Sequence, residues 1–372
     1  MKIVADDRIP YLPGVFESCG VEVVYLPGRE IASRHLADAD ALIIRTRTRC
    51  DRSLLENTSV KMVATATIGC DHISAGDLAD LDIHWCNAPG CNASSVQQYV
   101  CSALINIAAD WKGKTLGVVG VGHVGSLVAR LGKILGMQVL LCDPPRADKE
   151  GQSGFVDLET IASLSDVVTL HVPFETAGAY PTAGMIGTDF FRAMKPGGTF
   201  INSSRGEVVD EPALLDALTS EHIKNAVIDV WCNEPCINAA LLKYAKYATP
   251  HIAGYSADGK ANGSAAVIRA VAQFFGIEKL KGFSCVPPDV PENVIDLAGL
   301  SGAGALAAAV NCTYDIARDD SALRQSIGDF EKLRGNYRFR REFPGFVLKN
   351  CPVECRELLS ALGFKLEEEE TC

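Results

Sequence analysis

Three side chains that could transfer protons and bind anions follow apolar, strand-like runs of the sequence. Arg205 stands in "NSSRGEVVD", Glu234 in "DVWCNEP" and His251 in "PHIAGYS". The carboxyl ends of parallel strands form the ligand-binding edge of an open α/β sheet. We therefore expect these three side chains to lie at the same edge.

These residue types suit the oxidation of a secondary alcohol by hydride transfer. A histidine can accept the hydroxyl proton near neutral pH. A carboxylate beside it orients the ring, and an arginine binds a substrate carboxylate or polarises the developing carbonyl. Each residue alone has an ordinary interpretation, as a surface ion pair, a loop acid or a structural histidine. Their order along one sheet favours a catalytic set of Arg205, Glu234 and His251.

A glycine-rich loop precedes these residues in "GVVGVGHVGSLVARLGKILGMQVLLCD". Gly120 permits the turn from strand to helix, Gly122 allows a pyrophosphate to approach the backbone, and Gly125 allows helix and strand to pack closely. Asp143 ends the next strand, where its carboxylate can accept hydrogen bonds from ribose hydroxyls and would repel a 2′-phosphate. The pattern predicts NAD as the cofactor and excludes NADP. The alternative is that the glycines only form turns.

The surrounding elements predict an α/β fold with two doubly wound parallel sheets. Residues 2–87 and 115–252 each alternate short apolar strands with helical segments, and the strands lack polar alternation, as expected when both faces are covered. A helix-like segment at about 261–276 leads back toward the first domain. After a proline-rich boundary, residues 282–372 form a third, α+β module.

Composition limits the class of partner and the compartment. The chain has 372 residues and a net charge of −11, which disfavours nucleic acid as a partner. It contains no apolar stretch long enough to span a membrane and no signal-peptide pattern, so we expect a cytoplasmic protein. The 14 cysteines include no C-x-x-C pair. We expect reduced thiols and no metal.

Several motifs resemble those of the D-isomer-specific 2-hydroxyacid dehydrogenases over residues 1 to about 280. They are "GVVGVGHVG", "SSRGEVVD", "DVWCNEP" and "PHIAGYS". Over nearly the whole chain, "ATATIGCDHI", "LLCDPPRAD", "HIAGYSADGKANG" and "DIARDD" are similar to the erythronate-4-phosphate dehydrogenase family. This resemblance implies NAD-dependent oxidation of 4-phospho-D-erythronate in pyridoxal 5′-phosphate (vitamin B6) biosynthesis. It also implies a cytoplasmic homodimer formed through the C-terminal domain.

The resemblance also implies domain roles. Residues 1–92 and 255–281 would form a flavodoxin-like substrate-binding domain, 93–254 a Rossmann NAD-binding domain, and 282–372 the dimerisation domain. Arg205 and Glu234 are then active-site residues, and His251 is the proton donor and acceptor. The expected cofactor-binding residues are Gly120, Gly122, His123, Val124, Gly125, Asp143, Val172, Ser203, Ser204, Arg205, Asp229 and Gly254. We expect the side chain of His123 to point to solvent. The expected substrate-binding residues are Arg45, Thr46, Thr67 and Tyr255.

Two arginine-rich segments suggest where a phosphorylated substrate could bind. In "IIRTRTR", Arg45, Arg47 and Arg49 would share one face if the strand continued. They would then suit an anion of several charges or, equally, a solvated sheet edge. In "KLRGNYRFRREF", the basic and aromatic run from Arg334 to Arg341 is expected on the surface of the dimer domain, from which it could reach a substrate phosphate across the interface.

Two alternative functions stay open. One is another D-2-hydroxyacid dehydrogenase, of the 3-phosphoglycerate type, and the other is a non-catalytic NAD-sensing binding protein that keeps the same fold and glycine loop. The family resemblance also suggests a tightly held NAD that a 2-oxo acid re-oxidises.

Overall fold

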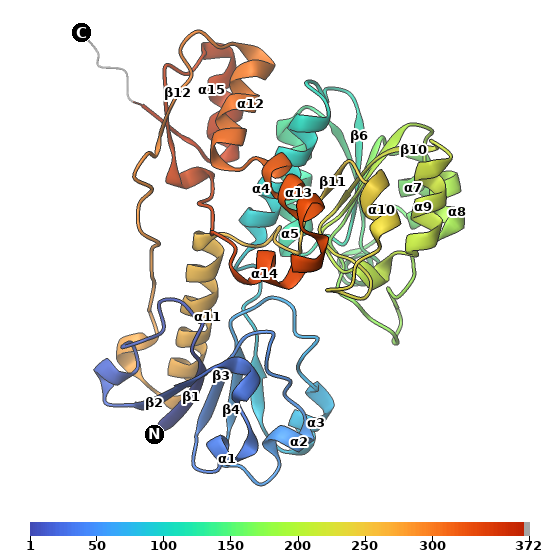
Figure 1. Cartoon of the computed structure of the whole chain (residues 1–372). Helices are drawn as coiled ribbons and strands as arrows, with labels where there is room; N and C mark the ends of the chain where they lie inside the picture. Colours follow the sequence, from blue (N-terminus) through green and yellow to red (C-terminus); the bar gives the residue numbers. More distant parts are fainter. Residues whose placement is uncertain (368–372) are drawn as a thin grey trace, which may run out of the picture. The chain divides into compact units, whose positions relative to one another are not determined.

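The computed structural model describes residues 1–367, which fall into two compact units (Figure 1). The first unit comprises Met1–Asn92 and Ser256–Pro288, and the second comprises Ala93–Tyr255 and the chain from Asp289 onward. No helix of the described residues is long and apolar enough to cross a membrane.

The first unit is a five-stranded parallel sheet in the order β2-β1-β3-β4-β5, which is the flavodoxin-like order. The strands are β1 (Lys2–Asp6), β2 (Glu22–Leu26), β3 (Ala41–Ile44), β4 (Met62–Thr65) and β5 (His84–Cys86). The helices are α1 (Ser33–Leu36), α2 (Arg52–Leu55), α3 (Ala75–Asp80) and α11 (Ala257–Phe275), with short 3-10 turns η1 (Glu17–Cys19), η2 (Gly28–Glu30) and η4 (Glu278–Leu280).

Successive strand residues of the first unit enter different cores, because side chains alternate across a sheet. Ile3 of β1 packs with Ile268 of α11 on one face, and Val4 packs with Leu54 of α2 on the other. Both faces are thus covered, which explains the apolar strands without polar alternation.

The second unit contains a six-stranded parallel sheet in the order β11-β10-β9-β8-β6-β7. The strands are β6 (Thr115–Val119), β7 (Gln138–Cys142), β8 (Val167–Leu170), β9 (Gly198–Asn202), β10 (Ile223–Ile228) and β11 (Tyr247–Ala248). The helices are α4 (Ala93–Ile107), α5 (His123–Ile134), α6 (Pro144–Glu150), α7 (Leu158–Leu164), α8 (Thr188–Ala193), α9 (Glu211–Thr219) and α10 (Ala239–Tyr244), with the 3-10 turn η3 (Gly206–Val208).

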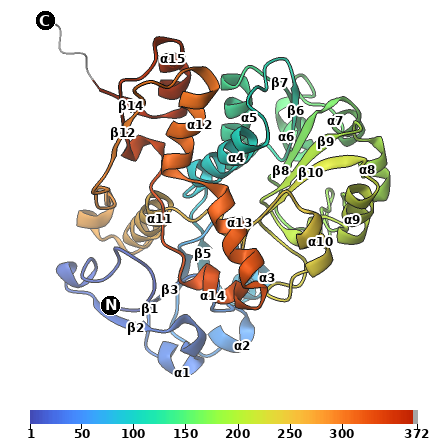
Figure 2. The ribbon, with the colours of Figure 1, turned by 45° about the horizontal axis from the view of Figure 1, so that its top comes forward.

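The chain order reverses between β6 and β8, where an open sheet binds ligands. In Figure 2, α4 and α5 lie on one side of this sheet, and α7, α8 and α9 lie on the other. The predicted fold class, with a flavodoxin-like sheet and a Rossmann sheet, is confirmed.

The rest of the second unit adds a three-stranded parallel sheet in the order β12-β13-β14. Its elements are β12 (Val294–Asp296), α12 (Gly302–Thr313), α13 (Ile316–Gln325), η5 (Ile327–Asp329), α14 (Phe330–Gly335), η6 (Phe343–Gly345), β13 (Val347–Lys349), α15 (Val353–Leu362) and β14 (Lys365–Leu366). Leu348 and Leu359 share one apolar core with Val100 and Leu131 of the Rossmann sheet's helices. The segment from β12 onward is therefore packed firmly against α4 and α5.

Candidate active site

The glycine loop joins β6 to α5 and leaves one face of its backbone open. Gly120 has a φ of +83°, and a Cβ there would lie 2.7 Å from the carbonyl carbon of His171. A Cβ at Gly125 would lie 1.9 Å from the carbonyl oxygen of Gly120, so helix and strand can approach only without a side chain. Gly122 has nothing within 4 Å of the same position. A pyrophosphate would fit at this open position.

The other residues of the loop flank that open position. His123 is exposed, as expected, and Val124 is half-buried in the first turn of α5. Val172 follows β8, and its Cγ1 lies 2.8 Å from an ideal Cβ at Gly120. Burial lowers the pKa of the neighbouring His171 to about 3, so this imidazole stays neutral.

Asp143 connects the second strand of the sheet to the glycine loop. One carboxylate oxygen accepts a hydrogen bond from Val121 N at 2.7 Å, and the other caps α6 by accepting one from Arg146 N at 3.1 Å. The Arg146 side chain forms a bidentate ion pair with Glu150 and donates to the Val121 carbonyl. The charge of Arg146 is therefore paired with that of Glu150.

Arg205 follows β9, which lies beside both β8 and β10 in the sheet. Its Nη1 donates to the Ser204 carbonyl at 2.7 Å, and the Ser204 hydroxyl donates to Asn202 Oδ1 at 2.8 Å. Ser203 Oγ is buried and has no hydrogen-bond partner among the described residues. A buried hydroxyl without a partner is costly, so Ser203 is suited to a ligand.

Glu234 and His251 form a direct pair beyond the ends of β10 and β11. His251 Nδ1 lies 2.8 Å from Glu234 Oε2 and 3.1 Å from Oε1, and Glu234 Oε1 also accepts from Trp231 N. Both side chains are largely buried, with 27% and 19% exposed. Burial opposes ionisation of Glu234, but the hydrogen bond from His251 and the charges of His251 and Arg334 outweigh it, so the pKa of Glu234 is lowered.

Comparisons with known proteins agree with this arrangement. Residues 94–253 match the D-isomer specific 2-hydroxyacid dehydrogenase, NAD binding domain. An erythronate-4-phosphate dehydrogenase of Bacteroides fragilis is 45% identical over 92% of this chain and 97% of its own length. That of Escherichia fergusonii is 40% identical over 98% of both. The chain belongs to the erythronate-4-phosphate dehydrogenase family.

Solved structures of similar proteins support the fold. An NAD-bound 3-phosphoglycerate dehydrogenase of Entamoeba histolytica has a TM-score of 0.63 at 24% identity, covering 77% of this chain and 98% of its own. A D-lactate dehydrogenase of Aquifex aeolicus with NAD and lactic acid has a TM-score of 0.61 at 24% identity, covering 78% and 100%. The cofactor of this family member is NAD, as predicted, because residues 94–253 match the NAD binding domain. Residues 288–363 match a domain of unknown function.

Asp229 has a role in this family member that the sequence analysis missed. Its side chain is 1% exposed and accepts hydrogen bonds from Thr249 Oγ1 at 2.6 Å, Ile252 N at 2.8 Å and Ala253 N at 2.9 Å. The backbone N–H of His251 donates to the Asp229 carbonyl, and His251 has a φ of +58°. Burial raises the pKa of Asp229, although His251 and these hydrogen bonds oppose the rise. Asp229 thus holds the backbone of the loop that carries His251.

The residues expected to contact substrate are divided between the two units. Arg45, Thr46 and Thr67 belong to the first, and Tyr255 belongs to the second, directly after Gly254. Thr46 is exposed. Thr67 Oγ1 lies 2.8 Å from Thr65 Oγ1 and donates to the Gly69 carbonyl.

The arrangement imagined for the arginines of "IIRTRTR" is wrong. β3 ends at Ile44 and the chain turns, so Arg45, Arg47 and Arg49 do not continue a strand face. Arg45 instead pairs with the buried carboxylate of Asp6 at 3.2 Å, and the exposed Arg49 pairs with Asp51.

The expectation for Arg340 also needs correction. Its side chain is 8% exposed and does not lie on a surface. It donates to Ala253 O at 2.7 Å, to Gln98 Oε1 at 2.9 Å and to Ser95 Oγ at 3.1 Å. All of these partners lie in the same unit, so Arg340 supports the backbone and is not available to a phosphate.

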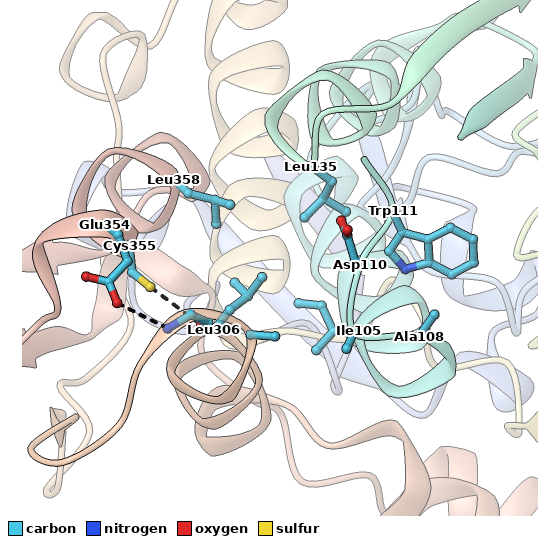
Figure 3. A pocket seen from close by; sticks show the side chains of 12 residues that line it. Ile105, Ala108, Asp110, Trp111, Leu135, Leu306, Glu354, Cys355 and Leu358 are labelled. Carbon is cyan, nitrogen blue, oxygen red and sulfur yellow. Dashed lines mark hydrogen bonds between the residues drawn. The ribbon is translucent and has the colours of Figure 1, made fainter. Parts of the chain in front are cut away.

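Thirteen cysteines are free among residues 1–367, and these residues contain no group of three or more His, Cys, Asp or Glu side chains suited to a metal. A separate pocket of about 390 Å³ lies between α4, α12 and α15 (Figure 3). Its lining is mainly apolar and includes none of the candidate site residues. Two carboxylates, Asp110 and Glu354, also line it, and Glu354 accepts a hydrogen bond from Gly302 N.

Proposed function

We propose that the chain catalyses the NAD-dependent oxidation of 4-phospho-D-erythronate to (R)-3-hydroxy-2-oxo-4-phosphobutanoate, a step of pyridoxal 5′-phosphate biosynthesis. The observation that carries the proposal is the Glu234–His251 pair, 2.8 Å apart at the end of the sheet that bears the glycine loop. The name of relatives 40–45% identical over at least 92% of the chain supports this substrate.

The geometry assigns the proton transfer to one atom of His251. Because Nδ1 is directed at the Glu234 carboxylate, its proton lies there and Nε2 carries the lone pair that accepts the substrate hydroxyl proton. When bound, NAD accepts the hydride from the carbon that carries this hydroxyl. Glu234 stays ionised and stabilises the imidazolium that forms.

Arg205 would act on the carboxylate or the developing carbonyl of the substrate. Its guanidinium donates a hydrogen bond to the Ser204 carbonyl. A fixed guanidinium presents paired N–H donors to a carboxylate or carbonyl oxygen. In this proposal Arg205 orients the reacting carbon, while Ser203 and Ser204 contact the cofactor.

A substrate panel tests the proposed reaction. The purified protein would be assayed at 340 nm with 4-phosphoerythronate, 3-phosphoglycerate and lactate, each with and without 2-oxoglutarate as acceptor. We expect turnover of 4-phosphoerythronate alone. Turnover of only another acid would refute the substrate assignment, and no turnover of any acid would favour the NAD-sensing binding protein.

The variant His251→Gln separates catalysis from cofactor binding. We expect kcat to fall by roughly 10²–10⁴-fold, the usual contribution of a general base, while the Kd for NAD changes little. Full activity in this variant would refute the role of His251.

Other features of the function stay predictions. They are the contacts of Arg45, Thr46, Thr67 and Tyr255 with a phosphorylated hydroxy acid, the three domain roles, the homodimer, the 2-oxo acid acceptor and the cytoplasmic location. Sedimentation of the purified protein would test the dimer.

A further inference from the structure

The C-terminal segment places an arginine beside the catalytic pair. Arg334, on α14, has its Nη1 3.5 Å from Glu234 Oε2, and its Nε donates to the Tyr255 hydroxyl at 3.2 Å. The guanidinium also lies over the Tyr255 ring, 5.9 Å from its centroid. Only 19% of the Arg334 side chain is exposed. A buried cation needs such partners, because burial alone would disfavour its charge.

The backbone around Arg334 is fixed to the catalytic loop. Arg340 donates to the carbonyls of Ile252 and Ala253, and its guanidinium lies 3.9 Å from the centroid of the Tyr314 ring. The ring of Tyr255 meets those of Tyr337 and Phe339 edge-on, at 6.1 Å each. The loop from His251 to Tyr255 is thus held by Asp229 and by four side chains of the C-terminal segment, which are Arg334, Tyr337, Phe339 and Arg340.

We propose that Arg334 is a positioning residue of the catalytic site, which holds the Glu234 carboxylate and the Tyr255 hydroxyl in place for His251. Arg334 belongs to the C-terminal segment, whereas Arg205, Glu234 and His251 follow strands of the six-stranded sheet.

The contacts of Glu234 explain what Arg334 adds. Oε1 accepts from Trp231 N, while Oε2 is shared by His251 Nδ1 at 2.8 Å and Arg334 Nη1 at 3.5 Å. Arg334 therefore fixes one oxygen from a side that His251 does not occupy. It also keeps Glu234 ionised, and the buried carboxylate of Asp229 is a further charge that acts on Arg334.

Replacing Arg334 should loosen the carboxylate and weaken its charge. Burial raises the pKa of Glu234, and the charge of Arg334 is among the effects that lower it. Without Arg334, the pKa of Glu234 rises and Glu234 binds a proton at a higher pH. The acidic limb of the kcat/KM profile should therefore move to higher pH in Arg334→Gln.

The kinetic experiment compares Arg334→Gln, Arg334→Lys and the control Arg338→Gln, whose exposed arginine lies on the same segment. This part rests on the proposed function. We expect Arg334→Gln to lower kcat about 10- to 100-fold, as a small misplacement of a catalytic group does, with the KM for NAD unchanged. Arg334→Lys should recover part of the loss, and Arg338→Gln should behave as the parent. A raised substrate KM with unchanged kcat and unchanged pH profile would overturn the proposal, because Arg334 would then bind substrate directly.

A spectroscopic experiment separates this proposal from the substrate assignment. Carbon-13 histidine spectra of the full chain with NAD, assigned with His251→Gln, report on the imidazole without turnover. The His251 signal should shift or broaden in Arg334→Gln and stay unchanged in Arg338→Gln. An unchanged signal in Arg334→Gln would overturn the positioning role. An inactive parent protein in which the signal does shift would refute only the proposed reaction.

Discussion

The two glycines Gly122 and Gly125 should respond to the same substitution in opposite ways. A Cβ at Gly125 would lie 1.9 Å from Gly120 O and 3.0 Å from Gly120 C, where ordinary carbon–oxygen contacts are about 3.3–3.6 Å. Gly125→Ala must therefore move α5 away from β6 by roughly 1.4 Å or more. Gly122 has a φ of −75° and open space around it, so alanine fits there.

The expected magnitudes follow from these environments. Overpacking typically costs about 1–3 kcal/mol, and the contact with fixed backbone puts Gly125→Ala in the upper part of that range. For a unit of this size, that loss lowers Tm by roughly 4–12 °C. Gly122→Ala should stay within about 1 kcal/mol of the parent, because alanine also restricts the unfolded chain.

For NAD affinity we expect the larger effect from Gly122→Ala, the variant that changes stability less. The added methyl would occupy the open position over the loop and keep the pyrophosphate from the backbone N–H groups. Loss of one charge-assisted hydrogen bond, about 1.5–3 kcal/mol, would raise the Kd for NAD about 10- to 100-fold.

Thermal unfolding without cofactor and NAD titration by calorimetry measure the two effects separately. The reasoning would be refuted if Gly122→Ala lost as much stability as Gly125→Ala, or if it bound NAD as the parent does. Either result would mean that the open face of the loop is not the pyrophosphate site.

Three further outcomes are expected. Asp143→Ser keeps a helix cap but removes the charge that repels a 2′-phosphate. The ratio of kcat/KM for NADP to kcat/KM for NAD should therefore rise at least about tenfold, which corresponds to the loss of one unfavourable contact of about 1.4 kcal/mol. An unchanged ratio would contradict the role of Asp143. Asp229→Asn replaces one acceptor oxygen by an NH₂ group, which then faces a buried N–H of the 249–253 loop and leaves that N–H without an acceptor. The penalty of about 1–3 kcal/mol should lower kcat about 10- to 100-fold. Normal turnover in this variant would contradict the role of Asp229 in holding the loop. At pH 8, an alkylating reagent should label the exposed Cys236 but not the buried Cys50, because burial raises the pKa of the Cys50 thiol to about 12. Peptide mapping would measure the labelling of each cysteine. Equal labelling of the two would contradict the burial of Cys50.

The sequence was informative where function depends on local spacing. The glycine loop, the strand endings and the alternation of elements follow from short-range pattern, and the sheet orders confirm the predicted fold. The helix α6 was missed although its signals are local: Asp143 as cap and prolines in the first turn.

The segment after β3 was misjudged because a strand's end depends on its neighbours. The apolar run to Ile44 resembles the start of a longer strand. However, the last residue of β3 that pairs with β1 is Ile43, and the last that pairs with β4 is Ile44, opposite Thr65. Beyond them no neighbour continues the ladder, and Arg45 turns to the buried carboxylate of Asp6. The sequence around Arg45 contains no trace of Asp6, which lies 39 residues earlier.

The same limitation explains why Arg334 could not be assigned from the sequence. Its run of basic and aromatic residues has the composition of a surface, and its partner Tyr255 is 79 residues away. Only the packing of α14 against the catalytic loop shows that the cation is largely buried beside Glu234. A charge that is buried must be compensated by specific partners, so burial changes the interpretation of a basic run from solvation to function. The loop that carries His251 is thus contacted by two distant parts of one unit, because Asp229 and the side chains of Arg334 and Arg340 all bond to it.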